Sequence, residues 1–182
     1  MDYKKLLKDA GALLEGHFLL TSGLHSDKYI EKMRILENPA LMGPFLDKMK
    51  DISPLTDWFI GPTLGGAIIA YELARIRERK SAFAERTDTG RVLKREFPIK
   101  NSDKIVIVDD ILTTGSSIKE TIKAIDKGRI VDIVVMIDRS TTNIETDLPI
   151  KAVLKYPIEN YDPKICHLCK EKVPLTKRGG KK

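Results

Sequence analysis

Two adjacent carboxylates, Asp109 and Asp110, close an apolar segment that begins at residue 104, and a turn rich in hydroxyl groups follows them. The turn reads Thr-Thr-Gly-Ser-Ser at residues 113–117, and an amphipathic helical pattern continues from residue 117 to Gly128. The start of a helix presents unpaired backbone N–H groups and the positive end of the helix dipole, and both attract anions. Hydroxyl side chains add donors, and a glycine lets a ligand approach the backbone closely. These residues therefore predict a phosphate-binding turn.

The two acids restrict what kind of ligand this turn can hold. Carboxylates would repel a nearby phosphate unless each group contacts a different part of one ligand. A sugar with a 5′-phosphate and vicinal 2′- and 3′-hydroxyls satisfies this condition, because its hydroxyls can donate to the acids. The spacing excludes a P-loop, whose Gly-x-x-x-x-Gly-Lys-Ser/Thr order is absent. The alternative is that Thr114 or Ser116 only caps a helix and that Asp109 and Asp110 form a polar strand end.

The stretch "IVIVDDILTTGSS" resembles the phosphoribosyl-pyrophosphate (PRPP) motif of type I phosphoribosyltransferases. In that motif an apolar strand, two acids and two apolar residues precede Thr-Thr/Ala-Gly-Ser/Thr. The resemblance implies a ribose-5-phosphate donor, a pyrophosphate leaving group and the cofactor Mg²⁺, bound mainly through PRPP with Asp109 as the one candidate protein ligand. It also implies a set of PRPP-binding residues, namely Arg86, Asp109, Asp110, Ile111, Leu112, Thr113, Thr114, Gly115, Ser116 and Ser117.

Three further segments resemble the orotate phosphoribosyltransferases in particular. Residues 16–32 resemble their N-terminal hood, with Phe18, Leu20, Ser22, Gly23, Ser26 and Tyr29 in the expected order. Residues 59–75 resemble the pyrophosphate loop, and "VVMIDRS" ends in an arginine that contacts orotate in that family. The resemblance implies transfer of phosphoribose from PRPP to orotate in a cytoplasmic homodimer. It assigns orotate binding to Arg139, whose alternative is a surface salt bridge, and catalysis to Arg86, Lys94 and Asp110. Thr113 is expected to face the base or only to shape the turn. His25 is expected to bind orotate or pyrophosphate in place of a missing cation, or to have no ligand role.

The chain also departs from that family pattern at several cationic positions. His25 stands where the hood turn often carries a lysine, and Gly65 stands where the pyrophosphate loop often carries another. The loop at residues 84–97 is short and lacks a histidine; its candidate cations are Arg86, Arg91, Lys94 and Arg95. Lys94 could equally lie on a solvated hairpin face.

Other functions stay open at this point. A phosphoribosyltransferase for a purine or another base would keep the same anion turn. A non-catalytic regulator that senses PRPP would keep the turn and tolerate the shortened loop. A nucleic-acid module rests only on the basic residues at the C-terminus, and we expect no nucleic-acid partner and no membrane partner.

The net charge of +6 is concentrated near one end of the chain. Residues 170–182 contain six basic residues and one acidic residue, which leaves about +1 for all the others. Such a segment is more often solvated and mobile than a binding stripe, and we expect residues 170–182 to behave in this way. Residues 163–182 are expected to form a separable basic C-terminal tail.

The two cysteines, Cys166 and Cys169, stand in a C-x-x-C pair that could be half of a zinc site, a redox pair or an incidental feature. Zinc prefers four ligands, and His167 between the cysteines is poorly placed to join them. A second pair of ligands would therefore have to come from another subunit.

The elements that must position these residues alternate in type along the chain. Strands are expected at 58–62, 81–85, 104–109, 130–138 and 151–156, with helices at 66–79 and 117–128 between them, a hairpin arm at 91–99, and Gly128 as a helix stop. Earlier residues predict a helix near the N-terminus, extended pieces at 17–20 and 28–36, and a helix at 39–50. This alternation predicts an α/β fold with a mostly parallel central sheet flanked by helices, as in type I phosphoribosyltransferases. We expect one domain over 1–182, with residues 1–36 in the hood. No apolar run approaches the length of a membrane span or signal peptide, which favours the cytoplasm.

Overall fold

The computed structural model describes residues 1–178, and the chain divides into two compact units. The terminal unit combines Met1–Leu41 with the chain from Pro157 onward, and the central unit is Met42–Tyr156. Helix α3 (Pro39–Ile52) crosses the boundary between them. Among the described residues, no helix is both long enough and apolar enough to cross a bilayer.

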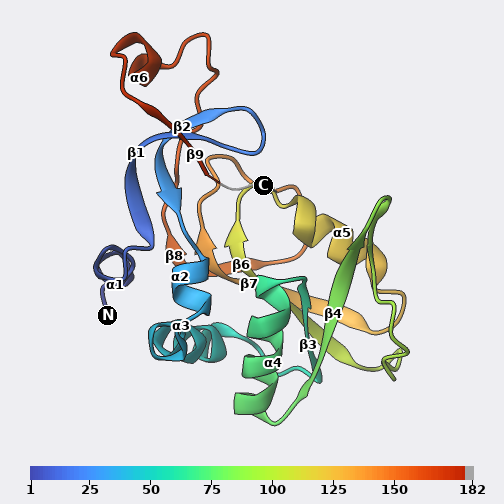
Figure 1. Ribbon diagram of the computed structural model, residues 1–182. Coiled ribbons are helices and arrows are strands. Elements are labelled where there is room, and N and C mark those ends of the chain that lie inside the picture. The colour runs from blue at the N-terminus through green and yellow to red at the C-terminus, as the bar shows by residue number, and fades with distance from the viewer. Residues whose placement is uncertain (179–182) are drawn as a thin grey trace. The chain divides into compact units, whose positions relative to one another are not determined.

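The central unit is built on a six-stranded sheet with the strand order β5-β4-β3-β6-β7-β8 (Figure 1). All neighbouring pairs are parallel except β4 and β5, which form an antiparallel hairpin. The strands are β3 (Trp58–Pro62), β4 (Lys80–Thr87), β5 (Gly90–Val92), β6 (Lys104–Leu112), β7 (Arg129–Asp138) and β8 (Ile150–Lys155). This arrangement confirms the predicted α/β class.

Two helices connect the parallel strands. Helix α4 (Gly65–Arg77) links β3 to β4, and helix α5 (Ser116–Ala124) links β6 to β7. The two connections lead in opposite directions along the sheet, so right-handed crossovers place the helices on opposite faces. Because the sheet is covered on both sides, β6 and β7 are mainly apolar along their middles, and on the α5 face Ile107 packs with Ile118 and Ile133.

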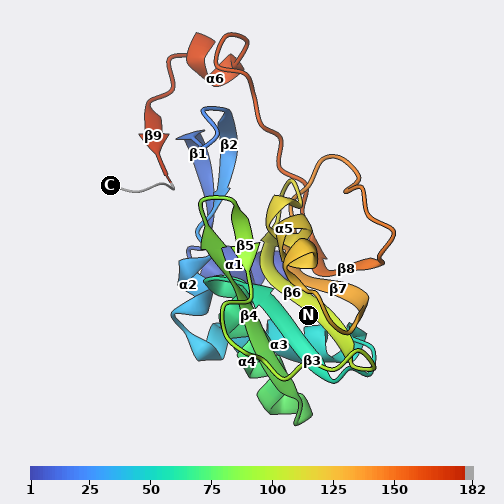
Figure 2. The same ribbon diagram turned by 90° about the vertical axis from the view of Figure 1, so that its right-hand side faces the viewer.

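The terminal unit has a three-stranded sheet of order β2-β1-β9 (Figure 2). Strands β1 (Leu13–Leu19) and β2 (His25–Ile30) form an antiparallel hairpin, and β9 (Leu175–Lys177) pairs with β1 in parallel. Three short helices complete the unit: α1 (Tyr3–Asp9), α2 (Met33–Leu36) and α6 (His167–Lys170). The ends of the described chain are thus joined in one sheet.

Several predicted elements differ from those observed. Residues Met33–Leu36 are helical, although an extended segment was expected at 28–36. Helix α5 ends at Ala124 because Ile125 is extended, and Gly128 (φ 85°) instead forms the turn that leads into β7. Residues 170–182 were expected to be solvated and mobile, but β9 forms within them and pairs with β1, and β9 follows the strand expected to be last. Residues 179–182 of that predicted tail lie outside the described part.

Candidate functional site

The strand order reverses between β3 and β6, and the loops that follow these two strands meet there. In open α/β sheets such a reversal opens a crevice at the carboxyl ends of the strands. Gly66, in the first turn of α4, fits into this junction without a side chain. A Cβ atom added to it would lie 2.7 Å from Pro62 Cδ, 2.9 Å from the Val108 carbonyl oxygen and 3.1 Å from Asp109 Oδ1. Glycine therefore lets the start of α4 reach the first acid of the pair.

The two acids lie side by side at the end of β6 and are nearly covered. Asp109 is 6% exposed and Asp110 is 2% exposed. The Asp110 backbone N–H donates to Asp109 Oδ1 over 2.8 Å, and the Ile111 N–H donates to Asp110 Oδ1 over 2.6 Å. Each carboxylate is thus fixed by the next residue's amide, which orients it before any ligand arrives.

The hydroxyl-rich turn leads into α5 as the sequence indicated. Gly115 has φ 76°, a conformation that favours glycine, and it begins the helix without a side chain to cap the first N–H groups. Thr114 Oγ1 and Ser116 Oγ are 2.9 Å apart. A cavity of about 100 Å³ at this turn is lined by Asp109 and by residues 111–118. Acid and turn therefore face one small space.

The predicted cations of residues 84–97 have different environments. Arg91 is inward-facing: its Nη1 donates to the backbone oxygens of Thr63 and Ala84, and its Nε lies 3.5 Å from Glu120. It therefore ties the hairpin to the loop after β3, and this structural role was not predicted.

Lys94 and Arg95 both pair with Glu85, at 3.6 Å and 3.5 Å. Within residues 1–178, Arg86 alone of the four forms no ion pair. It is exposed on β4 and lines a hollow of about 460 Å³ that Arg91 and Lys123 also line. No carboxylate of the described residues therefore neutralises the Arg86 guanidinium.

Arg139 follows β7 directly and is 8% exposed. Its backbone N–H donates to the Leu112 carbonyl oxygen over 2.9 Å, which holds the residue after β7 beside the end of β6. Thr113, the next residue after Leu112, is half-buried and lines the cavity at the turn. The structure thus brings the backbones of two predicted orotate contacts, Thr113 and Arg139, to neighbouring strand ends.

His25, the third predicted orotate contact, belongs to the terminal unit. Its ring is buried, and its Nδ1 lies 2.9 Å from His17 Nε2. Sequence reasoning did not single out His17, because nothing in its local pattern marks it.

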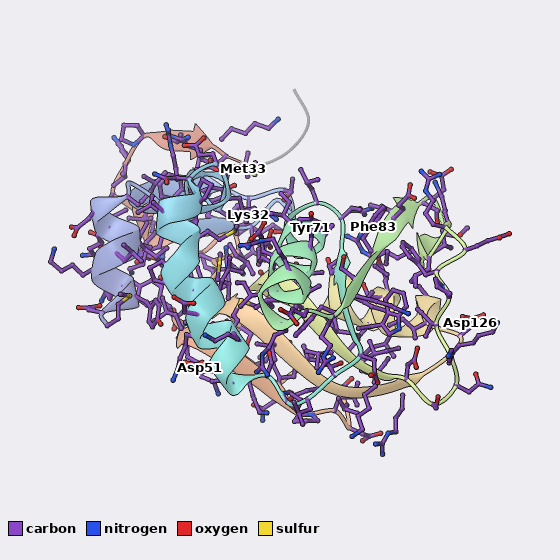
Figure 3. The ribbon with its side chains drawn as sticks, turned by 90° about the horizontal axis from the view of Figure 1, so that it is seen from below. Lys32, Met33, Asp51, Tyr71, Phe83 and Asp126 are labelled. Atoms are coloured by element: carbon purple, nitrogen blue, oxygen red, sulfur yellow. The ribbon has the colours of Figure 1, made fainter. Side chains whose placement is uncertain are left out.

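An aromatic contact fixes the segment that follows the β4–β5 hairpin. Phe83 lies on β4, beside α4, where Tyr71 is 62% exposed (Figure 3). The Phe83 ring packs edge-on against Phe97, with ring centroids 5.8 Å apart. The segment after the β4–β5 hairpin is thereby held against β4.

Comparison with known proteins agrees with this arrangement. Residues 50–165 match the family model described as "Phosphoribosyl transferase domain". Two orotate phosphoribosyltransferases are similar over nearly the whole chain. The relative from Caldicellulosiruptor bescii is 39% identical over 99% of this chain and 97% of its own length, and that from Caldicellulosiruptor saccharolyticus is 40% identical over 99% and 96%.

Solved structures share the fold. An orotate phosphoribosyltransferase from Aeropyrum pernix superimposes with a TM-score of 0.72 at 24% identity, covering 83% of this chain and 92% of that one. An adenine phosphoribosyltransferase from Thermoanaerobacter pseudethanolicus gives a TM-score of 0.59 at 16% identity, covering 71% and 88%. The chain therefore belongs to the phosphoribosyltransferase family. Within that family it is an orotate phosphoribosyltransferase-type enzyme, like both full-length relatives.

Proposed function

We propose that this protein transfers the 5-phosphoribosyl group of PRPP to orotate, giving orotidine 5′-monophosphate and pyrophosphate. One observation carries the proposal: the fixed, buried Asp109 carboxylate and an uncapped helix start line the same small cavity, and the buried Asp110 directly follows Asp109 at the end of β6. It is supported by the names of the two full-length relatives. The reaction belongs to pyrimidine biosynthesis, and we place it in the cytoplasm.

In this proposal the donor's ribose lies across the end of β6. Asp109 and Asp110 accept hydrogen bonds from the 2′- and 3′-hydroxyls, and the N–H groups and hydroxyls of residues 113–117 donate to the 5′-phosphate. Breaking the bond between C1′ and pyrophosphate leaves positive charge on the ribose ring. The two carboxylates favour that charge, and because the amides of the following residues already orient them, they need little reorganisation as it develops.

The leaving group requires positive charge from the other side of the ribose. Arg86 is the protein cation that we assign to it, since Lys94 and Arg95 are paired with Glu85. Carboxylate oxygens suit Mg²⁺, and Asp109 lines the cavity, so the residues fit a Mg²⁺ ion held mainly by PRPP. When bound, Mg²⁺ neutralises charge on the pyrophosphate.

Orotate is the proposed nucleophile, attacking C1′ through N1. Arg139 offers a planar fork of donors that suits a carboxylate or an imide face. Thr113, the first residue of the turn after β6, adds a polar group near the base. Together these two residues are proposed to select the base and hold N1 in line with C1′.

The test follows orotate absorbance in a mixture of purified protein, PRPP, orotate and Mg²⁺. The proposal expects a loss of absorbance that depends on PRPP, and an Asp110→Asn variant should lower kcat/KM by about 10²-fold or more. Asp126→Asn is the matched control, because Asp126 is an exposed loop carboxylate with the same charge change. It should behave as the wild type does.

Other results would contradict the proposal in different ways. Turnover with adenine or hypoxanthine but not with orotate would identify a purine enzyme. PRPP binding without turnover of any base would identify a PRPP-sensing regulator, the alternative that Gly65 and the short loop leave open.

A further inference from the structure

Four potential metal ligands from distant parts of the sequence converge in the terminal unit. They are His17 on β1, His25 at the start of β2, and Cys166 and Cys169 around α6. One ligand atom from each residue lies within 4.8 Å of all the others. We propose that these side chains bind a single structural Zn²⁺ ion.

The distances between the ligand atoms suit a tetrahedral zinc ion. Zn–N bonds of about 2.0 Å and Zn–S bonds of about 2.3 Å at tetrahedral angles separate the ligand atoms by roughly 3.3–3.8 Å. Cys166 Sγ and Cys169 Sγ lie 3.6 Å and 3.7 Å from His17 Nε2, and Cys169 Sγ lies 3.3 Å from His25 Nδ1. The two histidine nitrogens are slightly closer, at 2.9 Å. Small side-chain shifts would therefore complete the tetrahedron.

His17 is already held in the tautomer that a metal ligand needs. Its Nδ1 lies 2.8 Å from the Val173 carbonyl oxygen, so Nδ1 carries the proton and donates it. The lone pair of Nε2 then points toward the cysteines and His25. Histidine ligands of zinc usually donate their second ring nitrogen to a carbonyl or carboxylate in this way.

The ligand set selects the metal and the type of site. Two thiolates balance the two charges of Zn²⁺, so the burial of three of the four residues does not isolate a net charge. Imidazole and thiolate ligands favour zinc over Mg²⁺, which prefers oxygen. All four tetrahedral positions are filled by protein, and such closed sites are structural rather than catalytic.

The chain around the cysteines has little else to stabilise it. In the described segment 162–178 Cys166 is the single buried residue, and α6 has four residues while β9 has three. Segments with so small a core usually depend on a metal or a disulfide. Zinc would join this segment to the β1–β2 hairpin directly.

The proposal revises two expectations from the sequence. The second ligand pair comes from the same chain rather than from another subunit. His25 becomes a zinc ligand instead of an orotate contact. His167 stays outside the cluster as expected, with its ring against Tyr161 at a centroid distance of 4.9 Å.

The first experiment measures metal in the purified wild-type protein by mass spectrometry, before and after incubation with Zn²⁺ and desalting. The expected result is about one zinc ion per chain. Replacing zinc with Co²⁺ should give the visible absorption of a tetrahedral cobalt–thiolate site. Less than about a tenth of an ion per chain under both conditions, or a disulfide between the cysteines in freshly purified protein, would overturn the proposal.

Variants locate the site. His17→Ala and Cys166→Ser should lose the zinc and the cobalt spectrum. His167→Ala should keep both, and it is the matched control because it removes a histidine from between the same two cysteines. Retention of a full zinc ion by His17→Ala would contradict the proposal.

A third measurement does not depend on the variants folding. Chelation of the wild-type protein should lower its melting temperature by roughly 5 °C or more, and should speed tryptic cleavage after the basic residues of 164–178. Adding Zn²⁺ back should reverse both effects, whereas Mg²⁺ should not. Unchanged cleavage after complete zinc removal would show that the ion does not stabilise this segment. Since none of these readouts involves orotate or PRPP, they stand apart from the proposed reaction.

Discussion

Asp103 joins two parts of the central unit through a single carboxylate. Its Oδ2 accepts hydrogen bonds from the Lys100 backbone N–H and from the Trp58 indole N–H, each over 2.9 Å. The Lys100 bond, followed by the Trp58 bond, lowers the pKa of Asp103 from its ordinary value of 3.8. Bonds to the charged form favour that form in the folded protein.

A lowered pKa means that the carboxylate stabilises the fold when it is ionised. This contribution is present above pH 3.8 and disappears as the pH falls through the lower folded value. Asp103→Asn should therefore lower the midpoint of urea unfolding at pH 7, and the difference from wild type should shrink below pH 3.8. Fluorescence of Trp58, the chain's single tryptophan, is the measurement.

Asp126→Asn provides the comparison for this pair of measurements. Asp126 is exposed, so the urea-unfolding midpoint of the Asp126→Asn variant should equal that of the wild type at both pH values. An Asp103→Asn effect that is equally large at pH 7 and in acid would show that the charge is not responsible.

At the residue scale, sequence reasoning succeeded where the chemistry was local. Asp109 and residues 113–117 are close in sequence, and their order alone predicted that the acid and the turn lie together, as they do around one cavity. Arg91 was grouped with the catalytic cations because its partners, Thr63 and Ala84, become neighbours only when β3 and β4 pair. The type of a residue does not reveal whether its charge faces solvent or a backbone carbonyl.

At the element scale, two helical glycines differ sharply in the space around them. Gly66 in α4 is crowded by Pro62, Val108 and Asp109, whereas a Cβ at Gly43 in α3 would meet nothing within 4 Å. Gly66→Ala should destabilise the protein by about 1–3 kcal/mol, because the loop after β3 would have to move. It should also reduce turnover, since the added methyl group pushes on Asp109. Urea unfolding and the orotate assay measure the two effects.

Gly43→Ala is the matched variant. It should change the free energy of unfolding by less than about 1 kcal/mol, because the gain in helix propensity is offset by contact with the ring of the following Pro44, and it should leave turnover unchanged. Equal effects of the two substitutions would contradict the close packing inferred at Gly66.

Strands of the central sheet were predicted closely because buried parallel strands are continuous apolar runs. The segment 28–36 was harder, since its mixed pattern fits both a strand and the short helix α2. The ends of α5 were also misjudged: Gly128 is a turn residue, and Ile125 leaves the helix first.

At the scale of the whole molecule, the resemblance implies a homodimer in which one chain's hairpin serves the other's site. If so, Arg86→Ala and Asp110→Asn chains, each weak alone, should complement each other when coexpressed. If equal amounts of the two variant chains pair at random, about a quarter of all active sites are intact, because half of the dimers are mixed and each mixed dimer has one intact site. Specific activity of the mixture, compared with each variant alone, is the measurement.

The control mixes Asp109→Asn with Asp110→Asn chains. Both changes lie at the same place in the site, so every paired site stays damaged. Recovery in this control, or none in the first mixture, would contradict the sharing of sites between chains.

The alternation of strands and helices predicted the class of fold. It did not predict which segments of the chain come together in the terminal unit. Its sheet depends on the pairing of His17 with Leu175, and its cluster joins His17 to Cys166 across 149 positions. Contacts at such separation leave no periodic signal. The tail was therefore taken for solvated chain.

The parallel pairing of β9 with β1 has a consequence for biosynthesis. Strand β1 emerges from the ribosome early, yet its neighbour β9 is translated only after every residue of the central unit. The central unit can fold as it appears, whereas the β1–β2 hairpin must wait with one edge uncovered. Slow translation would prolong that exposure.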